Sequence, residues 1–213
     1  MALYRGIPTL GAELSGWRAG LRYIAGLDEA GRGPMAGPVV AAALVLDPET
    51  PAPWWSDLRD SKALTARRRA ELSDRLRATA AYGVGSASHS EIDTLGLVPA
   101  TRQAMLRALA VLPLRPDLLL IDAMTLPESD AEQRAIVHGD AVCLSIAAAS
   151  IIAKVERDQM MVVYGEQYPE YGFARHRGYV TRDHLRALEE HGPCPIHRRS
   201  FAPVRAYLQR HQR

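Results

Sequence analysis

The sequence predicts a single α/β domain in which helices cover both faces of a central sheet. Two observations favour this fold class: short apolar runs typical of buried strands alternate with longer helical segments, and no repeat or low-complexity tract divides the chain. The length of 213 residues fits one domain over 1–213. Apolar residues at 47% and charged residues at 23% exclude a disordered chain and a disulfide-stabilised miniprotein.

Two apolar runs open the predicted sheet. Residues 21–27 and 38–46 are mainly apolar, and we expect both to form buried strands. The segment between them, 28–37, contains three glycines and one proline. Such a segment turns sharply, so we expect the two strands to form a hairpin-like arrangement.

Helix and strand signals alternate through the middle of the chain. Thr65 is a typical N-cap for a helix that runs to about residue 80, and 82–88 has the composition of a strand. Ser88 and Glu91 form an S-x-x-E capping box, which predicts that the next helix begins there. A further helix is expected over 100–112.

The following elements each deliver an acidic residue. The short apolar strand 118–121 ends at Asp122, and a second short strand, expected at 135–137, leads to Asp140. Residues 141–164 contain no glycine or proline and predict one long buried helix.

Charge is uneven along the chain, although the formal net charge is only +2. Residues 171–213 hold nine arginines against three acids, whereas 1–170 hold 17 basic and 21 acidic residues. This C-terminal segment is either a solvated arginine-rich face, which is the commoner case, or a surface that follows phosphates. Only two basic residues are lysines, Lys62 and Lys154, which indicates that a compact point charge is needed at these positions.

The composition also restricts the setting of the protein. Cys143 and Cys194 form no CxxC motif, so we expect free thiols in a reducing cytosol. The first 20 residues lack the apolar core of a secretion signal, and the longest apolar stretch, 34–46, is shorter than the roughly 20 residues that cross a bilayer. We therefore expect a cytoplasmic protein without a membrane segment, and a monomer, because no amphipathic stretch is left over once the helices are placed.

Four acids are candidates for a metal site. Asp28 and Glu29 follow one apolar strand, Asp122 ends another, and Asp140 follows a third. Neighbouring strand ends would gather these carboxylates, and such a cluster persists when it holds a hard cation such as Mg²⁺ or Mn²⁺. Two such cations are a common apparatus for the attack of water on a phosphodiester. The alternative is that each acid merely caps a helix or begins a turn.

The glycine-rich segment after Glu29 does not match the common phosphate-binding loops. Gly31-x-Gly33-x-x-Ala36 resembles a dinucleotide fingerprint only superficially, because prolines flank the point where a helix would have to begin. No Gly-Lys-Ser/Thr follows, which excludes a P-loop. What remains is a backbone that can approach a ligand closely, with Arg32 in its middle.

Several sequence blocks closely resemble the signature of bacterial ribonuclease HII and occur in that family's order. They are Tyr23-Ile-Ala-Gly-Leu-Asp28-Glu29-Ala-Gly31-Arg32-Gly33-Pro34, Ala36-Gly37-Pro38-Val39-Val40-Ala41, Asp60-Ser61-Lys62, Glu91-Ile92-Asp93, Leu120-Ile121-Asp122, Gly139-Asp140, Ala148-Ala149-Ser150-Ile151-Ile152-Ala153-Lys154-Val155 with Arg157-Asp158, Tyr171-Gly172-Phe173 with His176-x-Gly178-Tyr179, and His197-Arg198-Arg199-Ser200-Phe201. The resemblance covers about 22–205, with 1–20 as a short N-terminal extension. Several motifs in register are more specific than any single one.

This resemblance implies a ribonuclease H-like fold, with a mixed central sheet flanked by helices and a helical, basic C-terminal segment. It implies a metal-dependent endonuclease that hydrolyses the RNA strand of RNA/DNA hybrids. The same enzyme would nick duplex DNA on the 5′ side of an embedded ribonucleotide, leaving 5′-phosphate and 3′-hydroxyl ends, and would serve to remove ribonucleotides from DNA. Its cofactors would be two Mg²⁺ or Mn²⁺ ions.

The resemblance also assigns roles to matching residues. Asp28, Glu29 and Asp122 match the metal-binding acids, and Asp140 matches the fourth catalytic and metal-binding acid. The substrate-binding positions are the loop that contacts the 2′-hydroxyl through its backbone (Gly31, Arg32 and Gly33), the tyrosine near the RNA-to-DNA junction (Tyr179), and two contacts to backbone phosphates (Ser61 and Lys62). We expect Asp158 to support the helix, and Lys154 to serve the active site or its fold.

Some positions depart from the family's usual residues, namely Gly96, Ala123, His138 and Glu156, but none of them is a matched metal ligand. Two other functions stay open. Ribonuclease HIII would share the fold but would be expected to carry an additional N-terminal domain, and only about 20 residues precede the first predicted strand. A non-catalytic module that binds hybrids is disfavoured, because four uncompensated carboxylates would repel phosphates.

Overall fold

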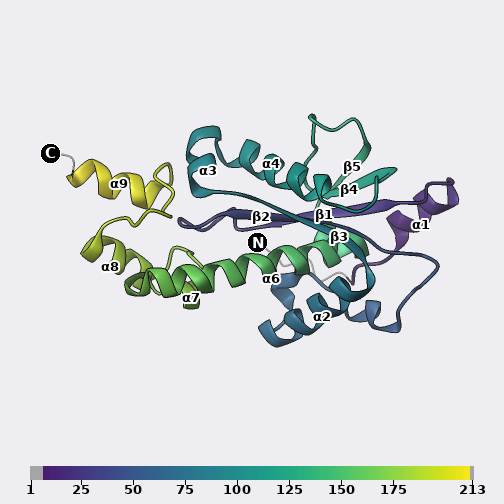
Figure 1. The fold of residues 1–213 in the computed structure, drawn as a ribbon, viewed down its shortest axis with the longest axis horizontal. Helices are drawn as coiled ribbons and strands as arrows, with labels where there is room; N and C mark the ends of the chain where they lie inside the picture. Colours follow the sequence, from purple (N-terminus) through teal and green to yellow (C-terminus); the bar gives the residue numbers. More distant parts are fainter. Residues whose placement is uncertain (1–6, 212–213) are drawn as a thin grey trace.

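The computed structural model describes residues 7–211, in which one five-stranded mixed sheet carries helices on both faces (Figure 1). Its strands are β1 (Ile24–Ala30), β2 (Val39–Val45), β3 (Ala81–Ala87), β4 (Leu118–Asp122) and β5 (Glu132–Ile136). Their order across the sheet is β3-β2-β1-β4-β5. The first three strands form an antiparallel meander, whereas β4 pairs in parallel with both β1 and β5. The predicted α/β class with a mixed sheet is confirmed.

The strands predicted at 38–46, 82–88 and 118–121 are confirmed with small shifts at their ends. The prediction for the first strand was wrong at both ends. β1 begins at Ile24 and continues to Ala30, so its two acids lie inside the strand and not in the turn. The cause is the pairing of β1 with β2. This pairing continues beyond the apolar residues of β1, because the two acids still pair with Ala42 and Ala41 of β2. β5 begins before the predicted 135–137, and its exposed residues explain the missing apolar signal.

Helices cover the sheet on both sides (Figure 1). α4 (Leu97–Ala110) packs on one face, while α2 (Ala66–Thr79) and α6 (Leu144–Gln167) pack on the other. The contact of α4 with β3 requires glycine. A Cβ atom on Gly83 would lie 2.1 Å from a backbone carbonyl oxygen of α4, and one on Gly85 would lie 2.3 Å from another. Backbone thus packs directly on backbone at this crossing.

The predicted helix caps are present in the middle of the chain. The Thr65 hydroxyl accepts a hydrogen bond from the backbone of α2, and Ser88 and Glu91 form the full capping box of α3 (His89–Leu95). α4 begins at Leu97, not at residue 100 as predicted. Gly96, with a φ of 87°, both ends α3 and starts α4, so the two helices follow each other without a loop.

The predicted helix over 141–164 was wrong in one respect, because the structure divides it. α5 (Gly139–Val142) ends at Cys143, whose extended backbone separates it from α6. The N-terminal segment stabilises this break, because Thr9 forms an isolated parallel bridge with Cys143. Glu13, on α1 (Gly11–Arg18), is fully buried and accepts hydrogen bonds from the Ser145 N–H at 2.7 Å and from the Cys143 thiol. A distant acid therefore caps the central helix.

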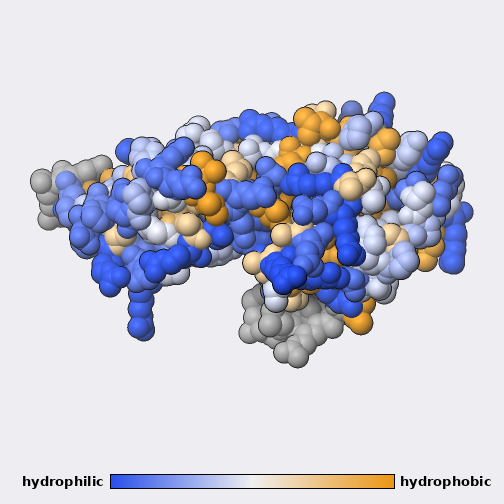
Figure 2. Space-filling view, turned by 60° about the horizontal axis from the view of Figure 1, so that its bottom comes forward, coloured by the Kyte–Doolittle hydropathy of each residue, from blue (hydrophilic) through white to orange (hydrophobic). Residues whose placement is uncertain are grey.

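The C-terminal segment is helical, as predicted. α7 (Phe173–His176), α8 (Arg182–His191) and α9 (Ala202–His211) follow α6 at the left of Figure 1. Figure 2 shows this part of the surface as predominantly hydrophilic. Short 3-10 helices occur at η1 (Pro53–Asp57), η2 (Ser61–Ala63) and η3 (Pro169–Tyr171). None of the helices within residues 7–211 combines the length and hydrophobicity that crossing a bilayer requires.

The buried cap predicts that Glu13→Ala destabilises the fold. The substitution leaves the Ser145 N–H buried without its acceptor, which should lower the free energy of unfolding by about 2 kcal/mol. Urea denaturation followed by circular dichroism measures this loss. Glu132→Ala, on the exposed edge strand β5, is the matched control and should change stability by less than about 0.5 kcal/mol. Equal effects of the two substitutions would contradict the capping role.

Candidate active site

The acids meet where the parallel pairing of β1 with β4 ends. Leu27 pairs with Ile121, so the next residues of the two strands, Asp28 and Asp122, lie side by side. Glu29 follows Asp28 in β1, and Asp140 comes from α5, directly after the neighbouring strand β5. Asp28 and Asp140 are nearly inaccessible, with 4% and 7% of their surface exposed.

Backbone and side-chain donors hold each carboxylate. Oδ1 of Asp28 accepts the N–H of Glu29 at 2.7 Å, and Oδ1 of Asp122 accepts the N–H of Gly139 at 2.7 Å. The second hydrogen bond ties the end of β4 to the start of α5, which carries Asp140. Two cations reach the cluster from outside, as Lys62 Nζ lies 3.2 Å from Asp140 Oδ2 and Arg32 Nη1 lies 3.3 Å from Glu29 Oε1.

The electrostatics of the cluster favour a further positive charge. Burial raises the pKa of Asp28 well above its usual range, and the neighbouring acids raise it further. Burial also raises the pKa of Glu29 and of Asp122. Although burial alone would lower the pKa of Lys62, the surrounding carboxylates, Asp60 and Asp140 foremost, raise it. The acids therefore repel one another, and a cation among them would relieve this cost.

The donor set fits a hard divalent cation. The four side chains offer carboxylate oxygens only, and Oε2 of Glu29 is buried without a hydrogen-bond partner. Such an orphaned acceptor is costly unless a ligand satisfies it. Within residues 7–211, however, no three ligating side chains converge closely enough to hold a metal ion as they stand. One carboxylate oxygen of Asp140 and one of Glu29 instead form ion pairs with Lys62 and Arg32.

The predicted substrate-binding residues share a cleft with the acids. This cleft of about 170 Å³ is lined by Asp28, Glu29, Ala30, Gly31, Arg32, Gly33, Ser61, Lys62, Asp122, Lys154 and Tyr179. Tyr179 stands at its rim with 43% of its surface exposed, and a Cβ placed on Gly33 would contact its ring at 3.6 Å. Asp140 does not line the cleft itself and reaches it through its ion pair with Lys62. The structure thus brings together all ten residues that the sequence singled out.

A basic cluster that sequence reasoning only partly found lies beside Tyr179. Lys154 Nζ donates to Asp158 Oδ1 at 2.6 Å and lies 6.0 Å from the centre of the Tyr179 ring. Arg69 and Arg177 also approach Asp158, at 3.7 and 3.8 Å. Asp158 therefore gathers three cations from different elements at the edge of the cleft. Spacing along the helix indicated its supporting role, but nothing in the sequence indicated the two arginines.

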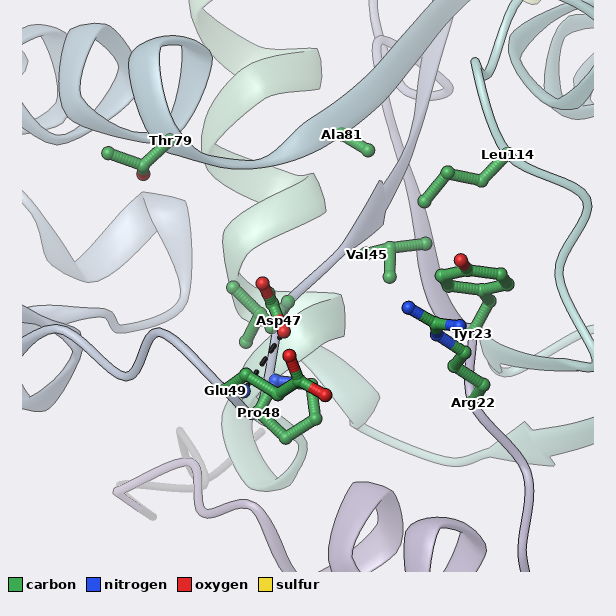
Figure 3. Close-up of a pocket in the computed structure, with 10 residues that line it drawn as sticks. Arg22, Tyr23, Val45, Asp47, Pro48, Glu49, Thr79, Ala81 and Leu114 are labelled. Atoms are coloured by element: carbon green, nitrogen blue, oxygen red, sulfur yellow. Dashed lines mark hydrogen bonds between the residues drawn. The ribbon is translucent and has the colours of Figure 1, made fainter.

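A larger pocket lies at the opposite ends of β1 and β2 and lacks such a cluster (Figure 3). It encloses about 280 Å³ between residues that flank these strands, among them Arg22, Tyr23 and Asp47. The Asp47 carboxylate is engaged within its own turn, where it accepts the N–H of Glu49 at 2.9 Å. This pocket therefore offers no gathering of carboxylates like the one beside the smaller cleft.

A chain of neutral histidines connects the C-terminal helices to Tyr179. His184 Nδ1 lies 2.9 Å from the Tyr179 carbonyl oxygen and must donate to it, so its Nε2 accepts from His197 Nε2 at 3.0 Å. His197 Nδ1 is then the acceptor for the Cys194 N–H at 3.0 Å. Burial lowers the pKa of His184 and His197 to about 4 each. One pattern of protons satisfies every member when both rings are neutral.

The fold is of the ribonuclease H type. The fold is similar to that of ribonuclease H2 from Pyrococcus horikoshii OT3, with a TM-score of 0.75, 28% sequence identity, and coverage of 90% of this chain and 99% of that one. It is also similar to the fold of Bst-RNase HIII, whose structure was solved in complex with Mn²⁺, with a TM-score of 0.65, 19% identity, and coverage of 95% and 75%.

Sequence similarity identifies the family within this fold. The family model for Ribonuclease HII matches residues 25–204. The ribonuclease HII of Desulfitobacterium hafniense is 52% identical over 193 residues, which cover 90% of this chain and 73% of that protein. The ribonuclease HII of Paracidovorax citrulli is 54% identical over 188 residues, which cover 88% and 77%. The chain belongs to the ribonuclease HII family and is an endoribonuclease. This confirms the resemblance and favours it over ribonuclease HIII.

The neutral histidine chain predicts that stability falls as the pH drops from about 6.5 to about 4. In this range the unfolded chain binds protons at both histidines, whose ordinary pKa is 6.5, whereas the folded protein keeps them neutral. Each histidine should lower the free energy of unfolding by up to about 1.4 kcal/mol per pH unit.

Urea denaturation at several pH values across this range measures the slope. His197→Gln should reduce the slope, while His211→Gln, on an exposed residue of α9, should leave it unchanged. Identical slopes for the wild type and His197→Gln would show that the buried histidines do not cause the acid sensitivity.

Proposed function

We propose that the protein hydrolyses the RNA strand of RNA/DNA hybrids and nicks duplex DNA on the 5′ side of an embedded ribonucleotide. The products would carry 5′-phosphate and 3′-hydroxyl ends, and the reaction would serve the removal of ribonucleotides from DNA. The observation that carries this proposal is the shared cleft, in which the gathered carboxylates lie beside the loop of Gly31, Arg32 and Gly33 in a chain of the ribonuclease HII family.

Asp28, Glu29, Asp122 and Asp140 would hold two Mg²⁺ or Mn²⁺ ions. Support comes from the oxygen-only donor set, the unsatisfied Oε2 of Glu29 and the mutual repulsion of the acids. When bound, such ions lower the pKa of a coordinated water and stabilise the charge that develops on the leaving oxygen. The hydrogen bonds from Glu29 to Asp28 and from Gly139 to Asp122 fix the direction in which these carboxylates point.

The other residues of the cleft would bind and orient the substrate. Backbone groups of Gly31, Arg32 and Gly33 would contact the 2′-hydroxyl, the atom that separates RNA from DNA. The exposed ring of Tyr179 would pack against the sugar and base near the RNA-to-DNA junction. Lys62, with 72% of its side chain exposed at the cleft, would contact a backbone phosphate, and Ser61, which lines the cleft beside it, would provide the second contact.

We further propose that the protein works as a cytoplasmic monomer. Cys143 and Cys194 are both free, as suits a reducing compartment.

Asp28→Asn should abolish cleavage without preventing folding. Asparagine removes one charge that would hold the cations. The loss of several kcal/mol of transition-state stabilisation corresponds to a decrease in rate of at least about a thousandfold. Because the neighbouring acids repel Asp28, the neutral side chain should not destabilise the fold.

The measurement is nicking of a labelled DNA duplex with one ribonucleotide, in Mg²⁺ or in Mn²⁺. Asp47→Asn, an exposed acid beside the pocket of Figure 3, is the matched control and should cleave like the wild type. If the wild type bound this duplex but produced no nick with either ion, the chain would instead be a binding module.

Lys62→Gln should weaken binding of the same duplex and make it less sensitive to salt. Loss of one phosphate contact should reduce the slope of log affinity against log salt concentration by about 0.9. Fluorescence anisotropy over a series of salt concentrations measures the slope. Arg67→Gln removes an equal charge at a residue with 91% of its side chain exposed on α2, and should leave the slope unchanged. An equal slope for wild type and Lys62→Gln would refute the phosphate contact.

A further inference from the structure

Two arginines are buried completely beneath the loop of Gly31, Arg32 and Gly33. Arg157, on α6, and Arg198, before α9, each have 0% of their surface exposed. None of the ion pairs within residues 7–211 includes either of them. A buried charge without an opposite charge is costly, so a particular set of dipoles must hold it.

Arg198 donates to four backbone carbonyls of one segment. Its Nη2 lies 2.6 Å from the Gly31 oxygen and its Nη1 lies 3.0 Å from the Arg32 oxygen. Its Nε lies 2.9 Å from the Gly37 oxygen, and Nη2 also reaches the Pro38 oxygen at 3.2 Å. The planar guanidinium thus ties the two ends of the turn between β1 and β2 together.

The direction of these hydrogen bonds also determines where the N–H groups on the opposite side of the loop point. In a planar trans peptide the carbonyl of one residue and the N–H of the next point in opposite directions. Because Arg198 draws the carbonyls of Gly31 and Arg32 inward, the N–H groups of Arg32 and Gly33 point away from it. Those two residues line the cleft beside the acids.

Arg157 joins the same turn to the segment that carries Tyr179. Its Nε donates to the Pro38 oxygen at 3.0 Å and its Nη1 donates to the Arg177 oxygen at 3.0 Å. Gly31, with a φ of +100°, cannot carry a side chain here, because a Cβ would fall 2.0 Å from Arg157 Nε. The loop and the tyrosine that follows Arg177 therefore share one buried support.

Both guanidinium groups stay charged at neutral pH. Burial lowers the pKa of Arg157 to about 10 and that of Arg198 to about 9. Lysine could not replace either residue, because an ammonium group lacks the fixed fork of donors that reaches several carbonyls at once. The ring of Phe201, 5.0 Å from the Arg198 guanidinium, covers its face.

We propose that Arg198 is a positioning residue for ribonucleotide selection, which aims the backbone N–H groups of the Gly31–Gly33 loop at the 2′-hydroxyl by holding the carbonyls behind them. Arg157 couples that loop to Tyr179. The proposal rests on the proposed function, in which this loop contacts the 2′-hydroxyl. It adds that the preference for a ribonucleotide depends on a side chain that never touches the substrate.

The test compares how the enzyme binds two duplexes of one sequence. The KM is measured for a duplex with one ribonucleotide, and the all-DNA duplex serves as a competitive inhibitor with constant KI. In Arg198→Lys the ratio KI/KM should fall about tenfold, the equivalent of about 1.4 kcal/mol. Arg134→Lys, on exposed β5, is the matched control and should keep the wild-type ratio.

The ratio separates positioning from a general structural defect. A defect that only lowers the amount of folded enzyme reduces kcat and leaves the ratio unchanged, and that result would overturn the proposal. Should Arg198→Lys not fold, Phe201→Leu keeps the guanidinium but removes the ring over it, and should lower the ratio in the same direction. An unchanged ratio in Phe201→Leu would then overturn the proposal. A wild-type enzyme that nicks neither duplex would instead refute the proposed function itself.

Discussion

The parallel pairing of β1 with β4 is the constraint on which the site depends. It sets Asp28 and Asp122 next to each other, at the point where the apolar interior of the sheet ends. The start of α6 packs directly on the backbone of β1 at the same place, because Gly26 has no side chain. A Cβ there would lie 2.2 Å from the backbone of Ser145. The short helix that precedes α6 carries Asp140, so one strand pair and one close helix contact gather acids from distant parts of the chain.

Positive charge surrounds these acids in two different ways. Lys62 and Arg32 pair with carboxylates directly at the rim, where solvent screens them in part. Arg157 and Arg198 lie below the loop and neutralise no acid, but their fixed charges add to the local potential. A nucleic acid that approaches the cleft therefore meets cations around a strongly negative centre. In the function proposed above, this arrangement would attract phosphates to the rim and leave the centre for metal ions.

Sequence patterns predicted the fold class, most strands and the gathering of the four acids, because each depends on local apolar runs and on the residues that end them. The other residues of the cleft were predicted only through the resemblance to the ribonuclease HII family. Sequence patterns failed where distant segments decide. The extension of β1 depends on its partner strand, and the break at Cys143 depends on Thr9 and Glu13. The run of C-terminal arginines predicts a solvated or phosphate-binding face, yet Arg198 is among the most buried residues of the protein. Spacing alone gives no sign that an arginine finds backbone carbonyls to satisfy it.

Because Glu13 caps α6, the start of the folded unit differs from the start of the stretch that matches the family model. The stretch that matches the family model begins at residue 25, after α1 has ended. Yet α1 supplies the acceptor for the first turn of the central helix, and Thr9 pairs with the residue before that helix. The stretch that the family model describes is therefore shorter than the part of the chain that packs together around α6. A chain trimmed to the matched stretch would lose Glu13, and with it the acceptor for the Ser145 N–H at the buried start of α6.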